Sequence, residues 1–283
     1  MEIKNVMVVG AGQMGGGIAQ AFAEAGYNVK LNDIKQEFVD NRLEIISKGL
    51  QHQVEKGRLE QQEFEEIMTH LTPSVSYDDA ADIDLVVEAA TENEKIKLSI
   101  FKELDEVAPK EAILASNTSS ISITKIAGAT KRHTQVIGLH FFNPVHAMKL
   151  IELNIGLTTS QETIQVVQKV GESLDKTVIM AKDSAGFVVN RILIPMINEG
   201  ICVLEEGIAS AEQVDEAMRL GSNVPMGPLE LADFIGLDVV LSIMQTLSAN
   251  FGDTKYRPAP LLVKHVEAGM LGRKTGHGFY NYE

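Results

Sequence analysis

The chain has 283 residues, of which 45% are hydrophobic and 23% charged, and its formal net charge is −14. This length predicts two domains at roughly 100–200 residues each. The acidic balance argues against nucleic acid and anionic membrane surfaces as partners, because both would be repelled. Cys202 is the only cysteine, which excludes an intrachain disulfide and favours a reducing cytoplasm. We expect neither a secretory signal nor a membrane-spanning run of about 18 apolar residues.

Short β-branched runs alternate with helical patterns in the first two thirds of the chain. The runs are VMVVG, YNVKLND, IDLVVEAA, AILASN and QVIGLHFF, and this alternation predicts βαβ units in a mostly parallel sheet. The spacing of apolar residues predicts long helices over residues 37–56 and 92–107. From about residue 184 the pattern is helical throughout. We therefore predict a sheet domain over residues 1–183 and a smaller all-helical domain over residues 184–283.

A glycine-rich stretch, Gly10-Ala11-Gly12-Gln13-Met14-Gly15, lies between the first predicted strand and a helical pattern. In such a turn the first glycine makes the bend, the second lets a pyrophosphate approach the backbone, and the third lets the helix pack closely on the strand. Asp33 ends the next strand, where its carboxylate can accept hydrogen bonds from ribose hydroxyls and repel a 2′-phosphate. These residues predict binding of NAD in preference to NADP. The alternative is a glycine-rich turn that serves packing alone.

A histidine and a glutamate flank a predicted hairpin in LHFFNPVHAMKLIEL, residues 139–153. If LHFF and MKLIEL are antiparallel strands centred on His146, His140 and Glu152 are equidistant from the centre and lie opposite one another. A carboxylate beside an imidazole fixes its tautomer and stabilises its protonated form, as a general acid/base requires. The alternative is a buried pair that serves structure alone.

Six segments of the chain resemble the 3-hydroxyacyl-CoA dehydrogenase family, and in particular its bacterial short-chain 3-hydroxybutyryl-CoA dehydrogenases. They are GAGQMGGGIAQ, ASNTSS, GLHFFNPVHAMKLIEL, DSAGFVVNRILIPMINEG, PMGPLELADFIGLD and GRKTGHGFYNY, in this order along essentially the whole chain. The resemblance implies a Rossmann-type doubly wound sheet domain followed by the helical domain. It also implies NAD-dependent interconversion of (S)-3-hydroxybutyryl-CoA and acetoacetyl-CoA without a metal, as part of fatty acid or butyrate metabolism.

The resemblance also implies roles for single residues. His140 matches the family's general acid/base and Glu152 the carboxylate that orients it. Two further residues match groups that hydrogen-bond the reacting substrate oxygen, Ser119 and Asn190. Substrate is expected in the cleft between the domains, where His140 would meet Asn190. Asp33 matches the ribose acid, and the residues that match contacts to the nicotinamide side of the cofactor are Glu92, Lys97, Ser119 and Asn143.

Binding of CoA by so acidic a protein requires a local basic surface. The family holds the CoA phosphates with basic residues on the helix after Asp33, and here Lys48, His52 and Lys56 are spaced four apart, on one helix face. His52 stands where relatives often have lysine. Because histidine is mostly neutral near pH 7, this departure weakens the expected phosphate contact. The alternative is a solvated basic face.

Two other functions fit parts of the sequence. The same architecture serves dehydrogenases of free hydroxy acids, from which a CoA enzyme differs by its basic helix face. A non-catalytic NAD(H)-binding protein is the second alternative, although a degenerate site would have lost catalytic residues that are intact here.

The long apolar helices near residues 188–204 and 231–244 exceed what a small domain needs to bury. They predict, as the resemblance does, a homodimer through the helical domain.

Overall fold

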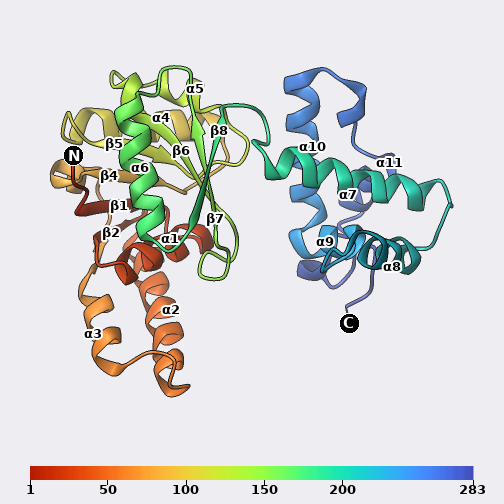
Figure 1. Ribbon diagram of the computed structural model, residues 1–283, viewed down its shortest axis with the longest axis horizontal. Coiled ribbons are helices and arrows are strands. Elements are labelled where there is room, and N and C mark those ends of the chain that lie inside the picture. The colour runs from red at the N-terminus through yellow and green to blue at the C-terminus, as the bar shows by residue number, and fades with distance from the viewer. Residues whose placement is uncertain (283) are drawn as a thin grey trace. The chain divides into compact units, whose positions relative to one another are not determined.

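The computed structural model describes residues 1–282, and the chain divides into two compact units, Met1–Ser184 and Ala185–Glu283 (Figure 1). The first unit is built on an eight-stranded sheet in the order β3-β2-β1-β4-β5-β6-β7-β8. Neighbouring strands are parallel except for β6 and β7, which confirms the predicted mostly parallel sheet. The strands are β1 (Asn5–Val9), β2 (Asn28–Asn32), β3 (Leu71–Ser74), β4 (Leu85–Glu88), β5 (Ile113–Ser116), β6 (Val136–Phe141), β7 (Leu150–Ile155) and β8 (Thr177–Lys182).

Helices connect the strands of the first unit and make up the second unit. Both long helices predicted from the apolar spacing are present as α2 and α4. The helices of the first unit are α1 (Gln13–Glu24), α2 (Gln36–Glu55), α3 (Gln61–Thr69), α4 (Glu94–Val107), α5 (Ile123–Ala127) and α6 (Gln161–Ser173). Those of the second unit are α7 (Val189–Glu205), α8 (Ala211–Ser222), α9 (Pro228–Ile235), α10 (Leu237–Phe251) and α11 (Pro260–Glu267).

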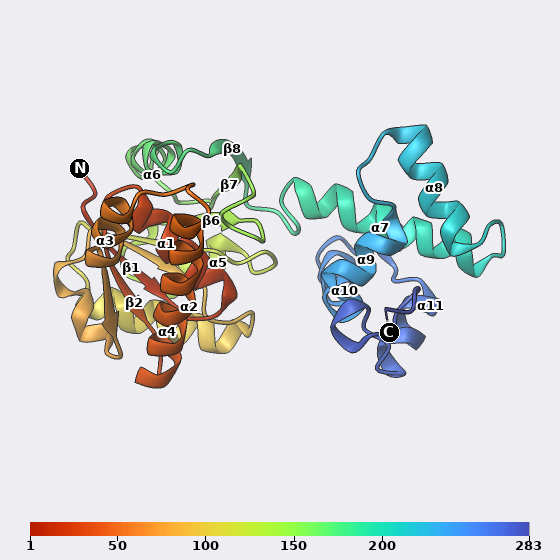
Figure 2. The same cartoon turned by 90° about the horizontal axis from the view of Figure 1, so that it is seen from below.

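The sheet has a separate apolar core on each face. Because side chains of a strand alternate between faces, Val6 and Val8 of β1 enter one core and Met7 and Val9 enter the other. The first core is completed by side chains of α1, α2 and α6, and the second by side chains of α4 and α5. Helices therefore cover both faces (Figures 1 and 2), as the predicted doubly wound fold requires.

Side-chain caps fix where several helices begin. Asn93 Oδ1 accepts the N–H of Ile96 at the start of α4, and Ser210 forms a capping box at the start of α8. Such caps satisfy backbone N–H groups that have no partner within the helix. The carboxylate of Asp183 caps α5 in the same way, accepting the hydroxyl of Ser122 at 2.7 Å and the N–H of Thr124 at 2.8 Å. The end of β8 is thereby tied to the segment between β5 and α5.

The second unit has its own apolar core, formed by side chains from α7 to α11. Within residues 1–282, no single helix is both long and apolar enough to cross a membrane. Taken together, α9 and α10 satisfy a test of length and composition, but they are bent by 99° at their junction. Residues of both helices lie in the core of the unit, among them Leu229, Val240 and Met244.

Candidate functional site

The glycine-rich turn adopts a conformation that requires glycine at two of its three glycine positions, Gly10 and Gly15. Gly10 follows β1 with a φ of +108°, and a Cβ there would lie 2.6 Å from Ala90 Cα. A Cβ on Gly15 would overlap the carbonyl oxygen of Gly10, whereas one on Gly12 would meet nothing within 4 Å. Gly12 is the N-cap of α1, so this open space lies at a helix N-terminus, where backbone N–H groups favour phosphate.

A cavity of about 300 Å³ adjoins this turn. Its lining residues are Ala11, Gly12, Asp33, Phe38, Asn41, Arg42 and Ile45. Asp33 Oδ2 accepts the N–H of Ala11 at 2.7 Å, which holds the carboxylate beside the glycine turn. A helix N-terminus next to a cavity that contains an acid fits the ribose and pyrophosphate of NAD.

Arg42 also lines this cavity and was not predicted from the sequence. Its Nε donates to the carbonyl oxygen of Ala11 at 2.9 Å, and its side chain crosses Gly16, where a Cβ would overlap Arg42 Cδ. In the stretch GGG after Met14, the glycine motif needs only Gly15. Gly16 is the one signal in the sequence that a side chain passes over the start of α1. Arg42 therefore helps to shape the cavity beside Asp33.

His140 and Glu152 are paired across β6 and β7, as the predicted hairpin requires. Glu152 Oε2 lies 2.9 Å from His140 Nδ1, and the two residues are only 1% and 6% exposed. A carboxylate at Nδ1 favours the tautomer in which Nδ1 carries the proton, so a proton exchanged with substrate would pass through Nε2. The ring of Phe142 lies against the imidazole, with 4.6 Å between ring centroids. The pairing is confirmed, and its catalytic role stays a prediction.

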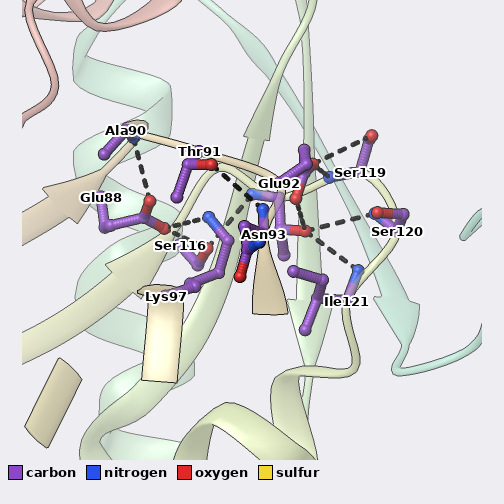
Figure 3. A network of polar contacts seen from close by, with 11 residues as sticks. Glu88, Ala90, Thr91, Glu92, Asn93, Lys97, Ser116, Ser119, Ser120 and Ile121 are labelled. Carbon is purple, nitrogen blue, oxygen red and sulfur yellow. Dashed lines mark hydrogen bonds and ion pairs between the residues drawn. The ribbon is translucent and has the colours of Figure 1, made fainter. Parts of the chain in front are cut away.

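Ser119 and Glu92 are brought together from loops that follow β5 and β4 (Figure 3). Glu92 Oε1 accepts the N–H of Ser119 at 2.8 Å and its hydroxyl at 3.2 Å. Glu92 Oε2 accepts the hydroxyl of Thr118 at 2.8 Å, and Thr118 was not predicted as a site residue. Both loops leave the carboxyl ends of parallel strands, the edge where open α/β sheets bind ligands.

Asn143 joins the hairpin to the glycine-rich turn. Its Oδ1 accepts a hydrogen bond from Gln13 Nε2 at 3.1 Å, so two predicted cofactor residues that are far apart in sequence are in contact.

Asn117 ties the neighbouring strands together, because its Oδ1 accepts the N–H of Phe141 at 2.8 Å. Asn117 was not predicted, although it lies in the quoted segment ASNTSS. Met14, by contrast, packs at the edge of the apolar core.

Lys97 differs from the other predicted cofactor residues because it is buried. It is 1% exposed and forms an ion pair with Glu88. Its ammonium is therefore directed into the first unit and toward a carboxylate. Direct contact of Lys97 with a cofactor stays a prediction.

The three residues expected to hold CoA phosphates lie along the C-terminal half of α2. Lys48 pairs with Glu44 at 2.6 Å, and His52 lies 3.4 Å from a carboxylate oxygen of Glu55. Both contacts are exposed and reduce the local positive charge. Lys56 is the C-cap residue of α2, where a cation is favoured by the helix dipole.

Asn190 belongs to the second unit, where it is the second residue of α7 and half-buried. It follows a turn in which Gly186 and Phe187 have φ values of +73° and +47°. Among residues 1–282 there is no group of three or more His, Cys, Asp or Glu side chains arranged to hold a metal ion.

Known proteins resemble this chain over its whole length. The NAD-binding domain of 3-hydroxyacyl-CoA dehydrogenase matches residues 5–184, and the C-terminal domain of that family matches residues 186–282. A probable 3-hydroxybutyryl-CoA dehydrogenase of Bacillus subtilis is 50% identical, with 100% of this chain and 99% of the relative covered. The crystal structure of (S)-3-hydroxybutyryl-CoA dehydrogenase from Ralstonia eutropha is 49% identical, with a TM-score of 0.97 over 100% of both chains. The chain therefore belongs to the 3-hydroxyacyl-CoA dehydrogenase family, which confirms the resemblance seen in its sequence.

Proposed function

We propose that this protein interconverts (S)-3-hydroxybutyryl-CoA and acetoacetyl-CoA with NAD(H). Family membership supports the reaction class, and the names of the relatives at about 50% identity support the short acyl chain. The observation that carries the proposal is the buried contact between His140 and Glu152, because an alcohol dehydrogenation of this kind needs one oriented general base. When bound, NAD accepts the hydride in oxidation and NADH supplies it in reduction.

Each residue of the site has a defined part in this proposal. His140 removes the proton of the 3-hydroxyl through Nε2 during oxidation and returns it during reduction. Glu152 holds Nδ1 and stabilises the imidazolium while the proton resides there. Ser119 and Asn190 supply neutral hydrogen-bonding groups for the 3-oxygen, whose charge changes during the reaction. Asp33 receives the adenosine ribose and disfavours a 2′-phosphate.

The CoA phosphates are proposed to bind at the C-terminal half of α2. Lys56 is the best candidate for a contact, since Lys48 and His52 each face a neighbouring carboxylate. Replacement of Lys56 by alanine is expected to raise the KM for acetoacetyl-CoA about five- to tenfold, because a charge-assisted phosphate contact is lost. Steady-state kinetics at fixed NADH measure this, with Lys110→Ala as the charge-matched control. An unchanged KM would remove α2 from the CoA site.

We also propose a cytoplasmic homodimer that forms through the second unit. Large apolar side chains of this unit are exposed, namely Ile192, Ile208, Leu220, Phe234 and Val239. Burying such side chains against a second copy would remove apolar surface from water. A mass measurement in solution tests the dimer, and a monomer at micromolar concentration would contradict it.

The proposed reaction is tested by comparing the wild type with His140→Ala. With acetoacetyl-CoA as substrate, NADH oxidation by the variant is expected to fall about 10³- to 10⁴-fold in kcat, because the general acid is gone. NADH binding, measured separately by fluorescence titration, is expected to be retained. Wild-type protein that binds NADH but turns over no 3-oxoacyl-CoA would contradict the proposal. Turnover of free acetoacetate would then favour a free hydroxy-acid dehydrogenase, and no turnover a non-catalytic NAD(H)-binding protein.

A further inference from the structure

Lys176 is a half-buried lysine that was not predicted as a site residue and that the proposed mechanism does not use. It comes directly before β8, the strand that pairs with β7 (Figure 1). Its ammonium donates to the carbonyl oxygens of Val145 at 2.7 Å and Met148 at 2.8 Å. Both carbonyls belong to residues 142–149, the hairpin loop that joins β6 to β7. Lys176 therefore holds the hairpin loop by its backbone.

The surroundings of Lys176 are unfavourable for a positive charge. Burial, and then the charge of Lys149, lowers the pKa of Lys176. Lys149 forms an ion pair with Asp175, so the two lysines bind different groups. An ammonium that donates to two carbonyls fixes their positions, because charge-assisted hydrogen bonds are stronger than neutral ones. The part that Lys176 plays thus depends on what the hairpin loop carries.

The hairpin loop carries two groups of the candidate site at its start. The ring of Phe142 lies against the imidazole of His140, and Asn143 Oδ1 accepts a hydrogen bond from Gln13 Nε2 at 3.1 Å. Asn143 is the residue expected to contact the nicotinamide side of the cofactor. It is exposed, as are most residues of the loop. Because a loop with few buried contacts opens easily, Asn143 keeps its position only if other groups hold the loop.

Val145 is the point at which the hairpin loop is held from two sides. Its side chain is 3% exposed and packs on α1, where a Cβ on Gly17 would lie only 3.0 Å from Val145 Cβ. Its carbonyl oxygen accepts the ammonium of Lys176. The loop is thereby fixed on the helix that begins at the glycine-rich turn, two residues after Asn143.

We infer that Lys176 is a positioning residue for the nicotinamide side of NAD(H), acting through Asn143. By holding the hairpin loop on α1, it keeps Asn143 beside Gln13. This inference rests on the proposed function, since Asn143 contacts the cofactor only if that function holds.

Lys176→Met tests the inference, because methionine has a side chain of similar length and no hydrogen-bond donor. The Kd for NADH, from fluorescence titration, is expected to rise about five- to tenfold as the loop loses two charge-assisted hydrogen bonds. ADP contains the adenosine and the pyrophosphate but lacks the nicotinamide side, so its Kd from calorimetry is expected to stay within about twofold of wild type. An unchanged Kd for NADH would overturn the inference. An equal loss for both ligands would also overturn it and indicate a general distortion of the first unit.

A double-mutant cycle with Asn143→Ala tests whether Lys176 acts through Asn143. The double variant is expected to bind NADH no more weakly than Asn143→Ala alone, because both changes remove the same contact to the cofactor. Effects that multiply would overturn the inference. A wild-type Kd in Asn143→Ala would do so too, since Lys176 would then have no contact to position.

Lys149→Met is the matched control. It removes an exposed ammonium from the same loop, and that ammonium binds Asp175. The Kd for NADH is expected to be unchanged, because exposed ion pairs contribute little. A loss as large as that of Lys176→Met would contradict the inference, since removal of a positive charge would then be sufficient.

These titrations also separate the inference from the proposed reaction, because they require no turnover. A wild type that binds NADH but fails to reduce acetoacetyl-CoA would contradict the reaction, while the Kd values would still judge Lys176. Normal turnover by the wild type, together with equal losses of NADH and ADP in Lys176→Met, would contradict the inference alone.

Discussion

Buried carboxylates occur in both units of the molecule, and they differ in the groups that they bind. In the first unit, Glu152 contacts the imidazole of His140, and Glu88 contacts the ammonium of Lys97. These partners are side chains that can carry or exchange a proton, although Glu88 also accepts one backbone N–H, that of Ala90, and the hydroxyl of Ser116. Glu88 ends β4, and Glu152 lies in β7 opposite His140 of β6.

In the second unit the buried carboxylates mainly bind the backbone. Asp215 and Asp233, 2% and 1% exposed, each accept two backbone N–H groups and a tyrosine hydroxyl. Asp215 accepts hydrogen bonds from Leu229 and Glu230, in the first turn of α9, and from Tyr280. Asp233 accepts hydrogen bonds from the C-terminal segment that follows α11, and the donors are Phe279, Tyr280 and Tyr282. Burial of an acid therefore does not by itself indicate a site. We predict that the partner is the better guide: a carboxylate on an imidazole, as in Glu152, serves chemistry, and one whose donors are mainly backbone N–H groups, as in Asp233, holds the chain in place.

Among the variants that test this distinction between acids, Glu152→Gln is expected to change activity the most. Glutamine keeps the size of the side chain but removes the charge that stabilises the imidazolium, so kcat for acetoacetyl-CoA reduction should fall about 10²- to 10³-fold. Thermal unfolding is expected to change little. The exposed Glu172→Gln is the control. A kcat within threefold of wild type would place Glu152 with the structural acids.

Asp233→Asn is expected to show the opposite pattern. An amide nitrogen placed among N–H donors leaves hydrogen bonds unmade, so the free energy of unfolding should fall by about 2–3 kcal/mol. Activity per folded molecule should stay within about threefold of wild type. Urea unfolding measures the loss, and Glu216→Gln on the exposed side of α8 is the control. A large loss of kcat without a loss of stability would break the comparison between the two units.

The fold could be predicted from the sequence wherever the strands are apolar and flanked by helices. Two strands outside the predicted set, β3 and β8, lie at the two edges of the sheet. β3 has four residues and includes Pro73, which is tolerated at an edge because an edge strand need not donate on both sides. β8 exposes Ile179 and Met180, so it lacks the alternation of apolar and polar residues that indicates a half-buried strand.

The sequence predicts the parts of the candidate site in which the geometry of the chain alone determines which residues are neighbours. The pairing of His140 with Glu152 follows from antiparallel register alone, because residues equidistant from a turn lie opposite one another. Arg42 and Thr118 could not be found in this way. Their partners, Ala11 and Glu92, lie 31 and 26 residues away, and only the packing of a helix or the adjacency of two strands brings them together. The burial of Lys97 depends on the same tertiary packing.

The smallest expected effect concerns Tyr282, which donates to Asp233 at 3.1 Å. Burial, and then the negative charge of Asp233, raises the pKa of Tyr282 to about 12 from its usual value near 10. The folded state therefore favours the neutral phenol. This contribution to stability is complete below about pH 10 and is lost as the pH rises toward 12. Burial also raises the pKa of Tyr77 to about 12, so absorbance at 295 nm measured against pH should show a rise near pH 12 that Tyr282→Phe reduces to the part contributed by Tyr77.

The same titration in Asp233→Asn sharpens the comparison between the units. Removing the charge should lower the pKa of Tyr282 only in part, because burial is the larger cause and remains. The Tyr282 contribution is the difference between this titration and that of the variant that also carries Tyr282→Phe, since Tyr77 titrates near pH 12 in both. A Tyr282 contribution that stays near pH 12 would mean that the carboxylate exerts no electrostatic influence on the phenol. A partial fall in the pKa of Tyr282 would show that the electrostatic influence of Asp233 on its neighbours is as strong as that of an acid in a functional site. Asp233 would then count as a structural acid because of its partners, which are a backbone segment and a phenol that stays protonated at neutral pH. The strength of its electrostatic field would not be the reason.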